Sequence, residues 1–208
     1  MPIIPFYGAH DRAMFEIERH AMDRRGEVID ALDRMLPSGL ILDIGAGNGF
    51  TAARLADDRR EVIAMEPATG MIDRSVAVPW VQGDAAQLPF DTEAFDGVYA
   101  TWAYFFSRDW DPTPGIRQAR RVTRSGGPII VVDSLGDDEF TALSEHDITA
   151  DPAFWTLHGF ACEVIDTAFE FDSLDDARRL LGLYFGDAGR AGARRTLSYR
   201  VGLFHTIV

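Results

Sequence analysis

Three glycines that alternate with other residues stand directly after a short apolar run. The run Leu40–Ile44 is followed by Gly45, Gly47 and Gly49, and Asp43 precedes the first glycine by two positions. Glycines let a backbone turn sharply and approach a ligand, where a Cβ would occupy the ligand's space. A carboxylate beside such a turn repels a pyrophosphate and attracts an ammonium group. The segment therefore predicts a binding loop for a cationic ligand without phosphate.

Two further carboxylates follow the next two apolar runs. Glu66 comes directly after Val62–Met65, and Asp84 comes shortly after Trp80–Gln82. An acid at the tip of the second strand can accept hydrogen bonds from both hydroxyls of a ribose, which does not separate NAD from an adenosine-bearing methyl donor. A strand-end Asp is commonly only a turn or a helix cap. Three acids at three successive strand ends nevertheless favour one shared nucleoside site.

The elements that must position these residues alternate along the chain. Short apolar runs, each too brief for a helix, are separated by helical or loop segments and lie at 40–44, 62–65, 80–82, 95–100 and 129–133. Continuous apolar strands of this kind predict a parallel sheet that is covered on both faces. Helical spacing runs from Phe15 to Leu36 and stops at Pro37. A helical stretch also follows the glycines, to about Ala56.

The last third of the chain has a different pattern. Phe160 to Phe171 and Leu197 to Ile207 read as long strands, and Leu174 to Phe185 reads as an amphipathic helix between them. Their uneven alternation predicts an antiparallel pair at one edge of the sheet. The expected fold is therefore α/β, a Rossmann-like, doubly wound and mostly parallel sheet.

Composition narrows the range of functions. A chain of 208 residues with 47% hydrophobic and 25% charged residues fits a single globular domain. Thirty-three acids oppose twenty bases, the net charge is −13, and every base is Arg. The lack of Lys excludes Schiff-base lysine chemistry and a P-loop lysine, and the acidic balance argues against a nucleic-acid partner.

Other features of the composition bear on location. The single cysteine, Cys162, cannot form an internal disulfide, and the first residues lack the pattern of a secretory signal. The apolar run from Pro128 to Val132 is far shorter than the roughly 20 residues of a membrane-spanning helix. We therefore expect a cytoplasmic protein without a membrane segment.

An aromatic run directly follows the fourth predicted strand. It comprises Thr101, Trp102, Ala103, Tyr104, Phe105 and Phe106. Ligands of open α/β sheets bind beyond the carboxyl ends of the strands, and aromatic faces exclude water while tolerating a cation. We therefore predict the reaction chamber here. Ser134, at the end of the fifth predicted strand, lies on the same edge, where an acceptor can be contacted. The histidines lack the spacing of a metal site, so no metal is expected.

Together these motifs resemble the class I S-adenosylmethionine-dependent methyltransferases, in particular the small-molecule type with a D-x-G-x-G-x-G loop. The resemblance runs from about Leu40 to Asp133. It implies a seven-stranded sheet with an antiparallel last strand and S-adenosyl-L-methionine as cofactor. By resemblance, the loop holds the methionine part, Glu66 the ribose, Met71 packs near the adenine, and Asp84 contacts the base. The cofactor-binding residues implied in this way are Asp43, Gly45, Ala46, Gly47, Asn48, Gly49, Glu66, Pro67, Met71, Gly83, Asp84, Ala85, Thr101 and Trp102.

In the same family, the segment ahead of the first strand often folds over the donor as a lid. Here Tyr7 is a candidate to reach the donor carboxylate, and His10 is a candidate base or acceptor-orienting group. The candidates for catalysis are thus Tyr7, His10, Trp102 and Tyr104, and those for the acceptor are Trp102, Tyr104, Phe105 and Ser134. We expect residues 1–38 to form the helical lid, 39–134 the cofactor-binding core, and 135–208 the substrate side and edge strands.

The sequence thus predicts methyl transfer to a small organic acceptor by in-line displacement, in which alignment of the reactants does most of the work. No residue is identified as the general base. Two alternatives stay open: a non-catalytic protein that binds S-adenosylmethionine for regulation, and an NAD-dependent oxidoreductase. A homodimer also stays open, since apolar surface patches cannot be read from a sequence.

Overall fold

The structure is a computed structural model that describes residues 8, 10–103 and 111–208. Its elements, in chain order, are α1 (Arg12–Ala21), α2 (Glu27–Met35), β1 (Gly39–Ile44), α3 (Phe50–Leu55), β2 (Arg60–Met65), β3 (Trp80–Val81), β4 (Gly97–Thr101), α4 (Thr113–Val122), β5 (Pro128–Ser134), η3 (Thr141–Leu143), α5 (Pro152–Leu157), β6 (Ala161–Glu170), α6 (Leu174–Gly192) and β7 (Thr196–Ile207).

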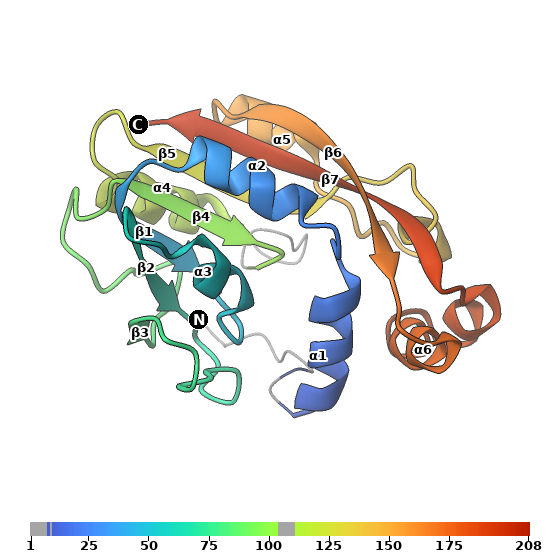
Figure 1. Ribbon diagram of the computed structural model, residues 1–208. Coiled ribbons are helices and arrows are strands. Elements are labelled where there is room, and N and C mark those ends of the chain that lie inside the picture. The colour runs from blue at the N-terminus through green and yellow to red at the C-terminus, as the bar shows by residue number, and fades with distance from the viewer. Residues whose placement is uncertain (1–7, 9, 104–110) are drawn as a thin grey trace.

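The strands form one seven-stranded sheet in the order β3-β2-β1-β4-β5-β7-β6 (Figure 1). Strands β1 to β5 pair in parallel, and β7 is antiparallel to both of its neighbours. The apolar residues Ile41, Leu42 and Ile44 of β1 are at most 1% exposed, because helices cover the strand on both faces. The predicted fold class is therefore confirmed, including the antiparallel last strand.

Two hydrophobic cores lie on opposite faces of the sheet. One core includes Leu32 of α2, Leu55 of α3 and Leu180 of α6. The other includes Ile116 of α4 and Trp155 of α5. In Figure 1, α2 and α3 accordingly lie in front of the sheet and α4 and α5 behind it. Because helices cover both faces of the sheet, the loops that follow the parallel strands lie at the carboxyl edge of the sheet.

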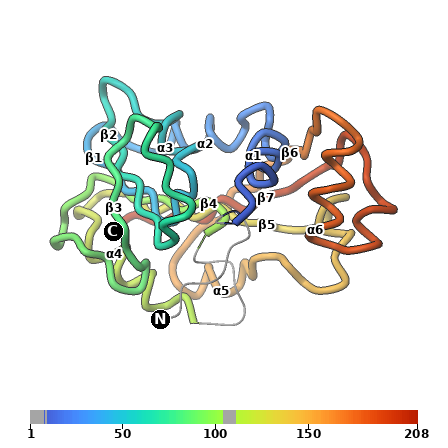
Figure 2. The backbone as a smooth tube through the Cα atoms, turned by 90° about the horizontal axis from the view of Figure 1, so that it is seen from below, coloured from blue at the N-terminus to red at the C-terminus, as the bar shows by residue number. Residues whose placement is uncertain are grey.

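Strands β6 and β7 extend past the carboxyl end of β5. β5 pairs with β7 only from Val201 to Ile207, whereas β6 continues to pair with β7 as far as Thr196. The extension carries Tyr199, and α6 joins its two strands. Figure 2 shows α1 between the β1–β3 side of the sheet and α6, and α1 contacts α6 and β6.

The helical segment expected from Phe15 to Leu36 is divided into two helices, α1 and α2. Between them, Asp23 and Gly26 adopt positive φ values of 52° and 81°. The Asp23 amide donates to the Ala168 carbonyl of β6 at 3.1 Å, and the Asp23 carboxylate accepts from the amide of Val28 at 2.9 Å. The break thus attaches the chain to β6 and starts α2, which turns α1 toward the carboxyl edge of the sheet.

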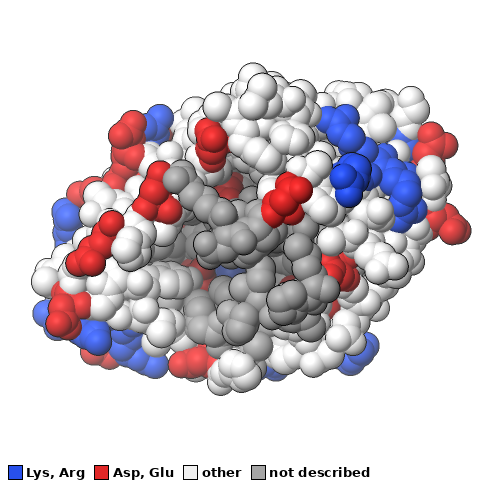
Figure 3. All heavy atoms as spheres, turned by 180° about the vertical axis from the view of Figure 1, so that it is seen from behind, with Lys and Arg blue, Asp and Glu red and all other residues white. Residues whose placement is uncertain are grey.

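Charges of both signs cover the face of the molecule in Figure 3. One group of Arg side chains gathers at the upper right of that view, and Asp and Glu side chains are spread over the face. Among the described helices, none has the length and apolar character needed to cross a membrane.

Candidate functional site

The turn between β1 and α3 has the conformation that its glycines allow. Gly45, Gly47 and Gly49 have φ values of 76°, 57° and 83°, which residues with a Cβ rarely adopt. A Cβ at Gly49 would approach the Trp80 ring to 2.8 Å. The amides of Gly45 and Ala46 both donate to the carbonyl of Met65 in β2, at 2.8 and 2.9 Å. The turn is thereby fixed beside the tip of the neighbouring strand.

Asp43 lies beneath this turn, inside the protein. Its carboxylate is 0% exposed, and Oδ2 accepts a hydrogen bond from the Tyr99 hydroxyl at 2.9 Å. Oδ1 is buried and has no hydrogen-bond partner among the described residues. Burial raises the pKa of Asp43 to about 7, Tyr99 and Arg19 act to lower it, and the nearby Glu66 raises it further. The site therefore contains a buried carboxyl with one unsatisfied oxygen.

Glu66 connects the tip of β2 to the glycine turn. The residue is 6% exposed, and its Oε2 accepts from the Gly47 amide at 2.9 Å. Oε1 accepts from the Ala68 amide, also at 2.9 Å. Burial raises the pKa of Glu66, and the two amide hydrogen bonds offset part of that rise. Each carboxylate oxygen can accept a second hydrogen bond, so a ribose diol remains compatible with these contacts.

The residues predicted to surround a base lie around the ends of β2 and β3. Met71 is 2% exposed, and its methyl group lies 3.6 Å from where a Cβ on Gly47 would stand. Asp84 accepts the amide of Ala86 at 2.8 Å, as an Asx turn does, and Ala85 is buried beside it. The carboxylate of Asp84 thus has a local structural partner, and its contact with an adenine stays a prediction. Pro67 and Gly83 are half-buried in the same two loops.

At the end of β4, Trp102 has an unusual backbone conformation with φ at 46°. Its indole N–H donates to the Tyr199 hydroxyl at 2.7 Å, and Tyr199 and Ser134 are joined through their hydroxyls at 2.7 Å. This polar chain connects the tips of β4 and β5 to the part of β7 that extends past them. Next to it, burial raises the pKa of Asp133 to about 7, although its Oδ1 accepts the Ser134 amide at 2.7 Å. The structure thus connects Trp102 and Ser134 through Tyr199, and their contact with an acceptor stays a prediction.

Other predicted site residues are placed elsewhere or lie outside the described residues. His10 is exposed, ahead of α1. Tyr7, Tyr104 and Phe105 fall outside the residues that the structure describes. Asn48 donates from its side-chain amide to Glu16 of α1 at 2.8 Å, and its side-chain oxygen accepts the amide of Phe50 at 3.2 Å.

Sequence reasoning missed three residues of the site. Tyr99 holds the carboxylate of Asp43, Tyr199 joins Trp102 to Ser134, and Arg19 of α1 is a buried cation next to the glycine turn. Of the three, only Arg19 could have been found from the sequence, because it lies four residues after Phe15 and therefore on the same face of the predicted helix. Within the described part of the chain, no group of three His, Cys, Asp or Glu residues is arranged to hold a metal ion.

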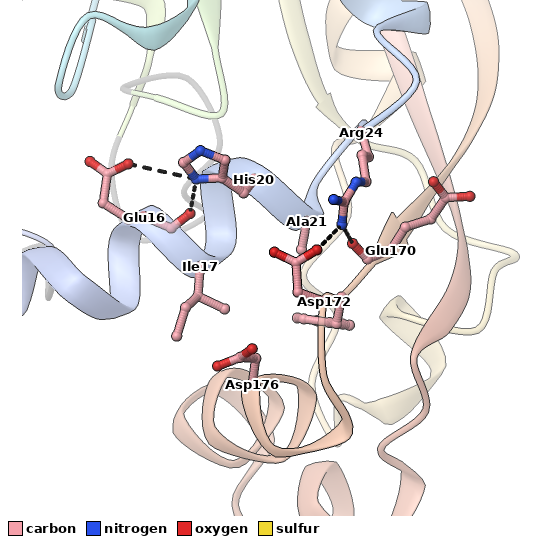
Figure 4. Close-up of a pocket in the computed structure, with 9 residues that line it drawn as sticks. Glu16, Ile17, His20, Ala21, Arg24, Glu170, Asp172 and Asp176 are labelled. Atoms are coloured by element: carbon pink, nitrogen blue, oxygen red, sulfur yellow. Dashed lines mark hydrogen bonds and ion pairs between the residues drawn. The ribbon is translucent and has the colours of Figure 1, made fainter.

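A separate cavity of about 230 Å³ lies on the other face of α1 (Figure 4). Ile17 and Ala21 of α1 line it, together with Asp176 of α6 and the end of β6. At its rim, Arg24 donates to Asp172 at 2.6 Å. None of the predicted site residues lines this cavity, although Glu16, which does, accepts a hydrogen bond from Asn48 of the glycine turn.

The chain is similar in sequence to proteins described as methyltransferases. Residues 42–131 match the family model described as a methyltransferase domain. A demethylmenaquinone methyltransferase of Beutenbergia cavernae is 37% identical over 119 residues, which cover 54% of this chain and 48% of that protein. The chain spans about half the length of the curated relatives that it matches.

Solved structures share the fold over nearly the whole chain. A protein of Thermotoga maritima described as a SAM-dependent methyltransferase, possible histamine N-methyltransferase, has a TM-score of 0.63 at 20% identity and covers 98% of this chain and 100% of its own. The [4+2]-cyclase SpnF has a TM-score of 0.56 at 19% identity and covers 89% of this chain and 81% of its own. The sheet order and these matches show that the chain shares its fold with proteins described as SAM-dependent methyltransferases, in agreement with the expected seven-stranded sheet. At such identities the solved structures establish the fold alone, and the chemistry has to be argued from the site.

Proposed function

We propose that this chain is an S-adenosylmethionine-dependent methyltransferase that transfers a methyl group to a small organic acceptor. One observation carries the proposal: the buried Oδ1 of Asp43 has no hydrogen-bond partner among the described residues, and Asp43 is the next-to-last residue of the strand that leads into the glycine turn. A buried polar atom without a partner is costly, so a ligand that supplies a donor is favoured. The ammonium group of the donor's methionine part is such a hydrogen-bond donor, and it is absent from NAD.

The remaining cofactor contacts follow the elements that meet at the turn. Glu66, at the tip of β2, is placed to accept the ribose hydroxyls, and its amide contact with Gly47 holds the turn in position. Met71 and Ala85 are buried and supply apolar surface for a base. When bound, the donor supplies an electrophilic methyl group on a cationic sulfur. The protein has to hold that group, exclude water and direct a nucleophile toward it.

On the acceptor side, we propose that Trp102 and Ser134 form a wall of the reaction chamber. The hydroxyl of Tyr199 contacts both residues, which fixes the indole and the Ser134 hydroxyl relative to each other. Tyr7, His10, Tyr104 and Phe105 remain candidates on the same side. Demethylmenaquinone is one acceptor to test, because the curated relatives bear its name.

The predicted division of the chain is part of the proposal. Residues 1–38 would act as the lid, 39–134 as the cofactor-binding core, and 135–208 as the substrate side. Contacts of α1 with the glycine turn support the first assignment, and the β6–β7 extension beside Trp102 supports the last.

Calorimetric titration with S-adenosylmethionine and with S-adenosylhomocysteine tests the donor site. We expect both to bind, and we expect Asp43→Asn and Glu66→Gln to weaken binding by roughly 10- to 150-fold, as for a lost charge-assisted hydrogen bond. Glu61→Gln is the matched control, because Glu61 is exposed on the same strand as Glu66. Unchanged affinity in both site variants would show that the residue assignments are wrong.

Transfer of a labelled methyl group to a panel of small acceptors separates an enzyme from a silent binding protein. Binding of the donor without transfer to any acceptor would favour the regulatory alternative. A change in the absorbance of added NAD at the nicotinamide band, in a protein that does not bind S-adenosylmethionine, would favour the oxidoreductase.

A further inference from the structure

Helix α4 and the turn after it carry a row of Arg side chains, here called the Arg stripe: Arg117, Arg120, Arg121 and Arg124. Within the helix, the spacing of three and four residues places the first three on a common side. The opposite side of α4, with Ile116 and Ala119, is buried in the core behind the sheet. Arg124 follows in the turn, where its Nε donates to the Glu93 carbonyl at 3.1 Å. In Figure 3, which shows the side of the molecule on which α4 lies, Arg side chains gather in one group.

The Arg stripe is a local surplus of positive charge in an acidic chain. The net charge is −13, yet residues 112–132 contain all four of these Arg and no Asp or Glu. Among the described residues, Arg124 forms an ion pair with Asp96, and the other three have no ion-pair partner. Asp111 lies near Arg117, since its pKa is lowered first by hydrogen bonds from Thr113 and also by the charge of Arg117. The stripe thus keeps positive charge that no carboxylate in the described part of the chain pairs with.

Neutral backbone atoms hold the two middle guanidinium groups of the stripe in place. Arg121 donates to the carbonyls of Leu88 and Phe90 at 2.9 and 2.7 Å. Arg120 donates to the carbonyl of His158 at 2.8 Å. A carbonyl orients a guanidinium without removing its charge, and the five N–H groups of an Arg leave donors for another partner. Because these side chains are already ordered, they lose little conformational entropy when an anion binds.

An exposed apolar side chain lies next to the Arg stripe. Leu157, at the end of α5, is 85% exposed, and it directly precedes His158, whose carbonyl accepts from Arg120. A single exposed Leu is ordinary on its own. Beside guanidinium groups it gives the combination that a lipid surface accepts, because Arg side chains pair with lipid phosphates while an apolar side chain enters the acyl boundary. Both helices lie behind the sheet in Figure 1, so the two features are on the same side of the molecule.

We propose that the Arg stripe and Leu157 bind the surface of an anionic lipid bilayer, so that the protein associates with membranes peripherally. The proposal goes beyond the proposed function and does not rest on it, because none of these residues belongs to the glycine turn. The net charge of −13 does not prevent such binding, since exposed charges are screened over about 8 Å at an ionic strength near 0.15 M. A nucleic acid offers phosphates without an apolar layer for Leu157, so the bilayer is the favoured partner.

Sedimentation with lipid vesicles measures this association. We expect the wild type to bind vesicles of phosphatidylglycerol and phosphatidylcholine at least about tenfold more tightly than vesicles of phosphatidylcholine alone. Raising the NaCl concentration from about 0.1 M to about 0.5 M should weaken binding to the anionic vesicles. Arg117→Gln and Arg120→Gln should each weaken it about fivefold, as expected for one basic side chain near an anionic surface. Leu157→Ser should also weaken it about fivefold, because it removes the apolar group that inserts.

Matched controls are available on α6, which lies at the opposite end of the molecule from α4 in Figures 1 and 2. Arg178 and Leu183 of this helix are both exposed. Arg178→Gln and Leu183→Ser make the same chemical changes as the stripe variants and should leave vesicle binding unchanged. Far-ultraviolet circular dichroism checks that each variant is folded.

Equal binding to both kinds of vesicle, or binding to neither, would overturn the proposal. Equal losses in the α4 and α6 variants would overturn it as well, because they would reflect net charge rather than a defined surface. Unchanged binding in Leu157→Ser, or tighter binding of the wild type to duplex DNA or polyglutamate at equal concentration of negative charge, would assign the stripe to a polyanion instead of a bilayer. None of these results requires donor binding, so a failure of the proposed function would be seen separately in the donor titrations.

Discussion

Replacing Asp43 by Asn is predicted to make the free protein less sensitive to pH. The carboxyl is 0% exposed, it receives one hydrogen bond from Tyr99, and its other oxygen has none from any residue that the structure describes. Burial is the main reason that its pKa rises from the ordinary 3.8 to about 7. The folded protein therefore holds a proton on Asp43 over a range of pH in which the unfolded chain does not.

The sign of the effect follows from this difference in bound protons. A carboxyl whose pKa is raised in the folded state contributes stability that is fully present below pH 3.8 and is lost as the pH rises through 7. Between these values the free energy of unfolding falls by about 1.4 kcal/mol per pH unit. Since the sequence has an isoelectric point near 4.7, measurements are best made from pH 5.5 to 8.5. In that window the contribution of Asp43 is a loss of about 2 kcal/mol, most of it below pH 7.

Urea unfolding followed by tryptophan fluorescence measures this contribution. We expect the free energy of unfolding of the wild type, minus that of Asp43→Asn, to fall by about 2 kcal/mol between pH 5.5 and 8.5. Asp58→Asn, which makes the same substitution at an exposed carboxylate, is the matched control. Asp133 also has a raised pKa, so its contribution to stability also falls with pH. That change cancels in each difference, because the wild type and both variants contain Asp133. A difference that stays flat for Asp43→Asn would refute the claim that the folded protein protonates this group.

Three further substitutions test the elements around the site. Gly47→Ala should lower the free energy of unfolding by about 1–2 kcal/mol and weaken donor binding. The alanine would have to adopt a positive φ, and its Cβ would lie 3.2 Å from the Phe15 ring. Urea unfolding measures the first effect and calorimetry the second. Tyr199→Phe should cost about 1–3 kcal/mol, since it removes the hydrogen-bond partner of the half-buried Trp102 indole, and an unchanged unfolding midpoint would contradict this. Arg60→Met should cost at least about 3 kcal/mol, because its buried guanidinium donates to several backbone carbonyls; a loss below 1 kcal/mol on urea unfolding would show that these bonds contribute little.

The parallel part of the sheet was predictable because it depends on short-range sequence patterns. Every side chain of β5 is buried, and the first five residues of the strand, Pro128–Val132, read as an uninterrupted apolar run. The glycine turn was predictable for a similar reason, since three positions with positive φ leave a local signature in Gly45, Gly47 and Gly49.

The break between α1 and α2 was not predictable, because its cause is distant in sequence. The apolar residues before and after the break share a partly helical spacing, and at the break the amide of Asp23 donates to Ala168 of β6, which is distant in sequence. The same holds for the partners of the candidate site. Tyr99 meets Asp43 across 56 residues and Tyr199 meets Trp102 across 97 residues, and neither pairing leaves a trace in the local pattern.

Two groups of the site are unusual for the interior of a protein, and this relates stability to function. The free protein holds a carboxyl at Asp43 with an unsatisfied oxygen and a buried guanidinium at Arg19 without an ion pair in the described part of the chain. Each lowers the stability of the fold, as local departures from good packing at functional sites commonly do. Because a ligand stabilises the state that binds it, S-adenosylmethionine should raise the unfolding temperature of the wild type more than that of Asp43→Asn at equal concentration.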